Sequence, residues 1–217
     1  MHNLYRNKEL LKIFGIIVAS CVLLIFFVHF FYSEFPEKTK KINANILIVE
    51  GWLPTPALEK AKYEFQHDGY DILIITGLNF TENYYQVSMD RKNRIINNFN
   101  SNAEQTRNEL IRMGVDPSRI VAVPAEGTNI NRTLKSALAF RDWLKESKCQ
   151  VKGINIISFG PHARRKWMIY DKILGKNYSV GIIYLPDYDN HNFLREIVKE
   201  LREFFGLVYY WIILIFY

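Results

Sequence analysis

The chain has 217 residues, of which 49% are hydrophobic, and its formal net charge is +6. This length suits one domain of ordinary size with appendages, and the apolar content excludes a disordered chain. The charge is too low for a dedicated nucleic-acid-binding protein, so no nucleic-acid partner is expected. It suits membrane lipid or a small anionic, phosphorylated ligand as partner. Cys21 and Cys149 are the only cysteines, which excludes a cysteine-rich zinc site.

An apolar run without Asp, Glu, Lys or Arg covers residues 13–32. At about 1.5 Å per residue, a helix of that length reaches roughly 30 Å, the thickness of a bilayer core. No small-residue cleavage site follows the run, so it predicts an uncleaved transmembrane helix rather than a signal peptide. Residues 1–12 are then the N-terminus and residues 33–44 a charged linker.

The charges beside this run favour one orientation. Arg6, Lys8 and Lys12 precede it, whereas Glu34 and Glu37 are the nearest charges after it. Positive residues prefer the cytoplasmic side, so we expect a cytoplasmic N-terminus and an extracytoplasmic domain. The predicted location is the cell (inner) membrane, with a single pass.

Residues 45–217 alternate between short apolar runs and segments of helical spacing. Nearly continuous, β-branched runs are typical of parallel strands buried on both faces. This alternation predicts an α/β fold with a Rossmann-like, doubly wound, mostly parallel sheet. The predicted strands are residues 46–49, 72–76, 120–123, 154–159 and 180–185.

Several local signals set the helix limits. Pro56 suits a first helical position, and Ser101 with Glu104 forms a capping box for a helix that Gly114 ends. A last helix is expected from about Asn192 into the apolar tail 207–217. The tail is too short to span a membrane, and we expect it to pack on the domain with its tip near lipid.

Two polar stretches interrupt this pattern. Residues 78–100 form a long segment with a basic run at 91–94, and a loop of that length is usually functional or mobile. Residues 187–191 read Asp-Tyr-Asp-Asn-His, which matches no calcium loop and predicts a polar turn. No metal site is expected from either stretch.

Candidate site residues follow the first two predicted strands. Glu50, Gly51 and Trp52 end the first strand, and Thr76 and Gly77 end the second. Ligands of open α/β sheets bind outside the carboxyl ends of the strands. Glu50 is a candidate general base, metal ligand or ribose acceptor, or it serves only the dipole of the following helix. A glycine at Gly51 lets a ligand approach the backbone.

The third strand is followed by Asn131, Arg132 and Thr133, with Ser136 one turn further on. Helix N-termini present free N–H groups and favour anions. Arg132 adds charge and Thr133 a hydroxyl. The segment therefore predicts an anion site, the alternative being an Asn131 cap beside a solvated arginine.

The fourth strand is followed by Gly160-Pro161-His162-Ala163-Arg164-Arg165. His162 titrates near neutrality and is a candidate acid or base. Arg164 and Arg165 are ligand-binding candidates, because arginine makes bidentate contacts with phosphate. They lie about 100° apart on a helix, so one serves the site and the other the surface.

These motifs, taken together, resemble the bacterial SanA/ElyC/YdcF family, long labelled a domain of unknown function. The resemblance covers roughly residues 45–211 and rests on the segments 50–54, 76–77, 132–137 and 160–165, with Gly206 and the segment 209–211. It implies a Rossmann-like domain, often tethered by one membrane helix, with roles in envelope, peptidoglycan or lipid-carrier metabolism. Leu78 departs from the Thr-Gly-Gly common in the family, and we expect its side chain to narrow the crevice or change the turn.

Three functional hypotheses follow. The first is a membrane-anchored envelope protein that binds a phosphorylated ligand, with phosphoester or pyrophosphate hydrolase or transferase chemistry. Glu50 and His162 would be its catalytic residues, and Arg132 and Arg165 would hold the anion. The second is a non-catalytic ligand-sensing or scaffold protein, favoured by the lack of a standard nucleophile motif. The third is a nucleotide-like cofactor, which rests on the fold class alone and leaves the cofactor unknown.

Overall fold

The computed structural model describes residues 12–20, 22–23, 39–80, 99–160, 162–186 and 193–217. The chain forms two compact units, Met1–Pro36 and Glu37–Tyr217. Residues 12–20 and 22–23 of the first unit are helical. Within the described ranges, no helix has both the length and the apolarity that a membrane crossing needs. The predicted span 13–32 lies partly outside those ranges, and the basic run 91–94 and the turn 187–191 lie wholly outside them.

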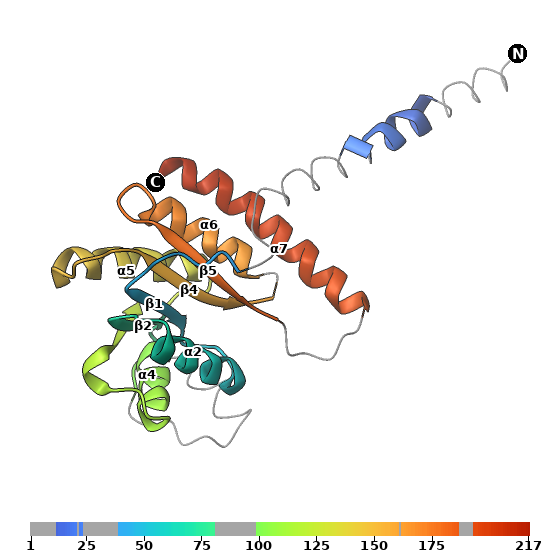
Figure 1. The fold of residues 1–217 in the computed structure, drawn as a ribbon. Helices are drawn as coiled ribbons and strands as arrows, with labels where there is room; N and C mark the ends of the chain where they lie inside the picture. Colours follow the sequence, from blue (N-terminus) through green and yellow to red (C-terminus); the bar gives the residue numbers. More distant parts are fainter. Residues whose placement is uncertain (1–11, 21, 24–38, 81–98, 161, 187–192) are drawn as a thin grey trace, which may run out of the picture. The chain divides into compact units, whose positions relative to one another are not determined.

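The second unit is built on one parallel sheet of five strands, which confirms the predicted fold class. The strand order is β3-β2-β1-β4-β5, with helices on both faces (Figure 1). The strands are β1 (Ile46–Glu50), β2 (Ile72–Leu78), β3 (Ile120–Ala125), β4 (Ile154–Phe159) and β5 (Val180–Leu185). Each predicted strand coincides with one of these, and β4 and β5 have the predicted bounds.

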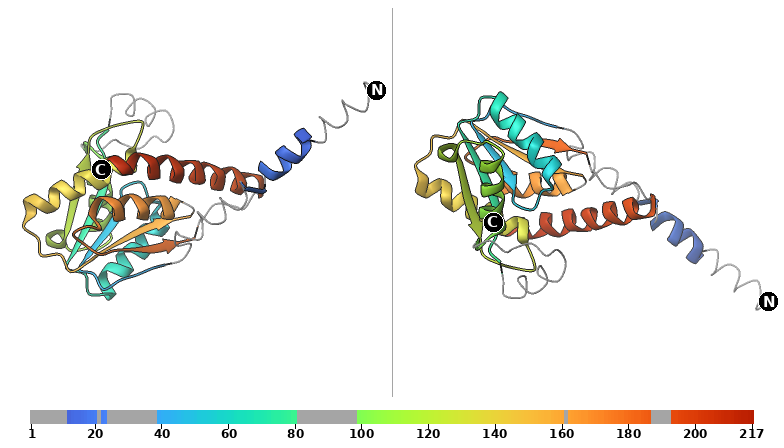
Figure 2. Two further views of the ribbon diagram at one scale, coloured as in Figure 1. Left: turned by 90° about the horizontal axis from the view of Figure 1, so that it is seen from above. Right: turned by 90° about the horizontal axis from the view of Figure 1, so that it is seen from below.

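The helices form a layer on each side of the sheet. One face carries α2 (Thr55–His67) and α4 (Asn102–Arg112), and the other carries α5 (Arg132–Ser147) and α6 (His162–Leu174). The long helix α7 (Phe193–Ile213) packs beside α6 (Figure 2). Two short 3-10 segments, Pro117–Arg119 and Leu214–Phe216, complete the described elements.

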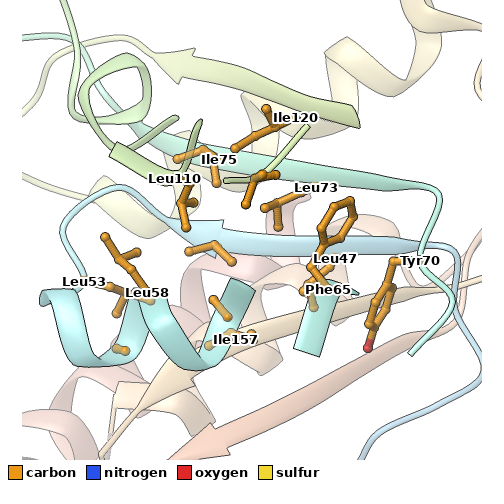
Figure 3. Close-up of a cluster of buried hydrophobic side chains, with 14 of the residues drawn as sticks. Leu47, Leu53, Leu58, Phe65, Tyr70, Leu73, Ile75, Leu110, Ile120 and Ile157 are labelled. Atoms are coloured by element: carbon orange, nitrogen blue, oxygen red, sulfur yellow. The ribbon is translucent and has the colours of Figure 1, made fainter. Parts of the chain in front are cut away.

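A hydrophobic core lies between the sheet and the pair α2 and α4 (Figure 3). Leu47 and Leu73 come from strands, Leu58 and Phe65 from α2, and Leu110 from α4, all at most 2% exposed. Burying a side chain of this size contributes about 1.5–3 kcal/mol relative to leaving it exposed. The apolar residues of α2 thus hold this helix against the sheet, directly after the end of β1.

The predicted cap at Ser101 is confirmed, whereas the Glu104 side chain reaches one residue further back than a capping box requires. The Ser101 hydroxyl accepts a hydrogen bond from the Glu104 N–H at 3.1 Å, and the Glu104 carboxylate accepts one from the Asn100 N–H at 2.8 Å. Gly114 follows the helix with φ of +97°, a conformation that glycine adopts without strain. The hydrogen bonds of Ser101 and Glu104 anchor the start of α4 beside the ends of β1 and β2.

The chain enters the second unit along the edge strand β5. Lys40 forms an antiparallel bridge with Ile182, and the Thr39 hydroxyl accepts a hydrogen bond from the Tyr184 N–H at 3.1 Å. Residues 39–44 therefore pack on the domain, ahead of the start at residue 45 that the sequence suggests. Because this pairing is antiparallel, the chain arrives from the carboxyl edge of the sheet.

The sheet has its topological switch point between β1 and β4. The helix after β1 covers one face, and the helix after β4 covers the other (Figure 1). The two connections separate at the carboxyl ends of these strands, where Rossmann-like folds have their ligand crevice. Glu50 ends β1, and Gly160 directly follows β4.

Candidate functional site

A cleft of about 590 Å³ opens at this switch point. The ends of β1, β2 and β4 form its floor, and the first turns of α5 and α6 together with α7 form its walls. Its lining residues are Glu50, Trp52, Thr76, Gly77, Leu78, Asn102, Asn129, Asn131, Arg132, Thr133, Ser136, Phe159, Gly160, His162, Arg165, Lys199, Arg202, Glu203 and Tyr210.

The predicted site residues converge on this cleft, except for two. Gly51 and Arg164 do not line it, whereas Glu50, Trp52, Thr76, Gly77, Arg132, Thr133, Ser136, Gly160, His162 and Arg165 do. Arg164 is only 7% exposed and does not line the cleft, while its neighbour Arg165 does. The expected divergence of the two arginines around α6 is thus observed, with Arg164 buried rather than at the surface.

Gly51 serves the packing of α4. A Cβ atom at this position would lie 2.6 Å from the Asn102 carbonyl oxygen, so only glycine lets the helix come this close. Gly77 meets the same helix, since its Cβ would lie 2.7 Å from the Ala103 N–H nitrogen. Leu78, where the family that the sequence resembles commonly has glycine, lines the cleft.

Glu50 is the buried carboxylate of the site, at 5% exposure. Its Oε2 lies 3.3 Å from the Nζ of Lys166, which is fully buried, and its Oε1 lies 3.6 Å from the Nε2 of His162. No hydrogen bond with good geometry reaches Oε2 within the described structure. The pair with Lys166 is therefore held chiefly by charge, in surroundings of low dielectric constant.

The two members of this ion pair respond differently to burial. Burial alone would raise the pKa of Glu50, but the charges of Lys166 and His162 prevail and lower its pKa to about 2. At Lys166 burial prevails over the attraction of Glu50 and lowers the pKa to about 8. Both residues are then ionised at neutral pH.

His162 joins two carboxylates. Its Nδ1 lies 3.6 Å from Glu203 Oε2, and its Nε2 lies 3.6 Å from Glu50 Oε1. Arg165 Nη2 lies 2.7 Å from Nδ1. Because arginine only donates, that contact assigns the tautomer of the neutral imidazole, which has its proton on Nε2. This tautomer aims the Nε2–H at Glu50.

The surroundings of His162 also favour its protonation. Burial disfavours the imidazolium, but Glu50 and Glu203 outweigh burial and raise the pKa of His162. Protonation at Nδ1 requires Arg165 to leave that nitrogen. Glu203 can hold the Arg165 guanidinium instead, because its Oε2 lies 3.0 Å from Arg165 Nε. His162 can therefore take up a proton at Nδ1 when Arg165 leaves this nitrogen for Glu203.

Positive charge surrounds this acidic centre. Arg132, Arg165, Lys199 and Arg202 line the cleft. The Arg132 side chain is exposed and has no ion-pair partner among the described residues. It opens α5, whose preceding residue Asn131 has φ of 55° and makes no side-chain cap. The first N–H groups of α5 are thus available to an anion, beside Thr133.

Sequence reasoning missed several members of the cleft network. Lys166 lies four residues after His162, a spacing that places both on one helix face and could have been noticed. Glu203, Lys199 and Arg202 come from α7, and no motif around them indicates a site. Among the described residues, no group of three or more His, Cys, Asp or Glu side chains is arranged to hold a metal ion.

Comparison of the chain with protein-family models and with curated proteins gives no match. The fold and the cleft define a Rossmann-like α/β protein with a charged site at its switch point. The resemblance to the SanA/ElyC/YdcF family stays a prediction that rests on the motifs quoted above.

Glu50 makes stability depend on pH in acid. Its pKa is about 2 in the folded chain against 4.5 ordinarily, so its contribution is present above pH 4.5 and is lost as pH falls to 2. Between pH 6 and pH 3, the wild-type chain should lose about 2 kcal/mol more unfolding free energy than Glu50→Gln. Urea unfolding at both pH values measures this. Parallel losses in the two chains would show that Glu50 is not stabilised as an anion.

Proposed function

We propose that this chain is a membrane-anchored protein of the cell envelope whose cleft binds a small anionic, phosphorylated ligand. The proposed chemistry is hydrolysis or transfer at a phosphoester or pyrophosphate bond. One observation carries the proposal. Arg132, which has no ion-pair partner in the part of the chain that the structure describes, and the uncapped start of α5 line the same cleft as His162, which is paired with Glu50.

The anion would lie against Arg132, Thr133 and the first N–H groups of α5. This arrangement offers positive charge and fixed donors to the oxygens of a phosphoryl group. The same donors would stabilise the charge that develops on those oxygens during transfer. Arg165 is a second anion ligand, because the phosphate can compete with Glu203 and His162 for its guanidinium.

His162 would move the proton. In hydrolysis, the oxygen of a water attacks phosphorus and the bond to the leaving oxygen breaks. His162 accepts the proton of the attacking water and then returns a proton to the leaving oxygen. Glu50 orients the ring and stabilises the imidazolium as it forms. Lys166 keeps Glu50 ionised, which this role requires.

The membrane anchor of the proposal is supported by the uncharged run 13–32. A helix over this run has the length of a bilayer core. The extracytoplasmic position of the domain is supported by the basic residues that precede the run.

A second function, ligand sensing without catalysis, is favoured by a different observation. Both ring nitrogens of His162 already face protein groups, Arg165 on one side and Glu50 on the other. Such a network transmits ligand binding at Arg165 to Glu203 and thus to α7. In this case the anion binds without turnover.

Anion binding is tested by the melting temperature of the full chain in detergent. Inorganic phosphate or pyrophosphate at about a hundredfold excess over Kd should stabilise the fold by about 2.7 kcal/mol and raise Tm by about 5–10 °C. Arg132→Gln should remove most of this shift. Lys145→Gln, which removes the same charge from the far end of α5, should keep it. An absent shift, or an equal shift in Arg132→Gln, would contradict the proposed anion site.

A further inference from the structure

The outward face of α7 is a continuous apolar stripe. Its residues are spaced three or four apart along the helix, so they share one side of it. We define the outer stripe as Val198, Leu201, Phe205, Tyr209 and Ile212 of α7, together with Phe216 in the 3-10 segment that follows it. All are exposed, including Phe205 at 66% and Phe216 at 84%. A series of this length is unlike the scattered exposed apolar residues of ordinary surfaces.

The opposite side of α7 already has its partners. Phe204, Leu207 and Tyr210 are buried, and α7 packs against α6. Glu203 and Tyr210 also border the cleft. The core therefore needs only one side of the helix, and the outer stripe has no packing role within the described second unit. A helix that is apolar on both sides normally has apolar surroundings on both.

The residues beside the stripe point to lipid as those surroundings. Arg202 is adjacent to it, with a side chain 73% exposed, and Lys199 follows further around the helix. Tyr209, Trp211 and Tyr217 are 47–59% exposed and cluster toward the end of α7 and the segment that follows it. Aromatic residues and flanking cations are the composition of helices that lie in a membrane interface. The net charge of +6 suits anionic headgroups.

The path of the chain gives an independent argument. Thr39 reaches the domain at the carboxyl edge of the sheet, the edge on which the cleft opens. Only residues 33–38 separate Thr39 from the uncharged run 13–32. Six residues reach at most about 21 Å, so an anchor formed by that run would hold this edge close to lipid.

We propose that α7 lies in the membrane interface with its outer stripe among the lipid acyl chains near the headgroups. This inference rests on the membrane anchor of the proposed function, and it does not depend on the ligand of the cleft. Since α7 also walls the cleft, the cleft would open beside the membrane surface. A phosphorylated ligand could then reach it from the lipid headgroup layer.

The test uses the full chain with Cys21→Ala and Cys149→Ser, reconstituted at high lipid-to-protein ratio. The vesicles contain phosphatidylcholine and phosphatidylglycerol. A single cysteine replaces Phe205 in the outer stripe or Arg112, an exposed residue of α4 on the other face of the sheet. Each variant carries an environment-sensitive fluorescent label on that cysteine. Both positions are exposed, so labelling leaves the core intact.

The label at position 205 should emit at shorter wavelength and be quenched at least about twofold by lipids with nitroxide-bearing acyl chains, because interfacial helices sit about 5–10 Å into that boundary. The label at position 112 should show neither effect. Equal, water-like behaviour at both positions would overturn the inference. A second outcome would also overturn the inference. In it, the label at position 205 emits at shorter wavelength, lipid nitroxides do not quench it, and dilution in lipid removes the shift. That result would mean that the outer stripe packs against a second copy of the chain.

Failure of the anchor is measured separately. Resistance of the reconstituted chain to carbonate extraction tests whether it is integral to the membrane. Extraction of the chain would contradict the anchor of the proposed function. A retained chain with a water-like label at position 205 would contradict only the placement of α7.

Discussion

Replacement of His162 by Asn is expected to lower the turnover of a phosphoester by about 10²- to 10⁴-fold, the usual contribution of a general acid or base. His162 is the titratable residue of the cleft whose ring lies between Glu50 and Glu203, both buried. Asparagine keeps a polar side chain of similar size but takes up no proton. The measurement is steady-state hydrolysis of p-nitrophenyl phosphate and of inorganic pyrophosphate by the full chain.

The matched control is His67→Asn. His67 is exposed on α2, where it stacks on Tyr63 with ring centroids 4.1 Å apart, away from the cleft. This variant should turn over as the wild type does. Equal rates in wild type and His162→Asn would remove His162 from the mechanism. Anion binding without turnover in the wild type would favour the ligand-sensing function.

Replacement of Lys166 by Met is expected to destabilise the fold by about 3–5 kcal/mol, the cost of leaving a buried carboxylate without its partner. Met fills a similar volume but carries no charge, and it also removes the long hydrogen bond from Lys166 Nζ to the Ile157 carbonyl oxygen at 3.4 Å. Lys166 is completely buried, and its Nζ lies 3.3 Å from Glu50. Urea unfolding of the full chain at neutral pH measures the change, and the double variant Lys166→Met/Glu50→Gln should recover most of it.

An exposed ion pair provides the control for this second prediction. Lys135 lies 2.6 Å from Glu126, with side chains 42% and 75% exposed. Lys135→Met should change the unfolding free energy by less than about 1 kcal/mol, because solvent screens such pairs. Additive effects of Lys166→Met and Glu50→Gln would mean that the two buried charges do not interact.

The sheet follows from local patterns of the sequence. Each strand is a short apolar run such as residues 154–159, and parallel strands buried on both faces need that composition. Cap residues such as Ser101 and Gly114 act over three or four residues, so their effect is visible in the chain itself. The region of the site was predictable for the same reason. The end of each strand can be recognised in the sequence, and in a parallel sheet the carboxyl ends of all strands lie at one edge.

The network around Glu50 was predicted only in part. Glu50 ends β1 and His162 begins the helix after β4, and we expected both in one site at the carboxyl ends of the strands. Glu203 is distant in sequence from both and reaches the cleft because α7 packs against α6. Arg164 and Arg165 are neighbours in sequence, but the packing of α6 buries Arg164 and leaves Arg165 lining the cleft.

The sequence by itself determined the parallel α/β fold, its helix caps and the strand ends that form the candidate site. Those features depend on periodicity and on residues close together in the chain. Only the tertiary structure decided that Lys166 is buried against Glu50, that Gly51 serves α4, and that α7 presents a second apolar face. Burial and the choice of an ionic partner depend on which distant elements pack together, and no local pattern encodes that.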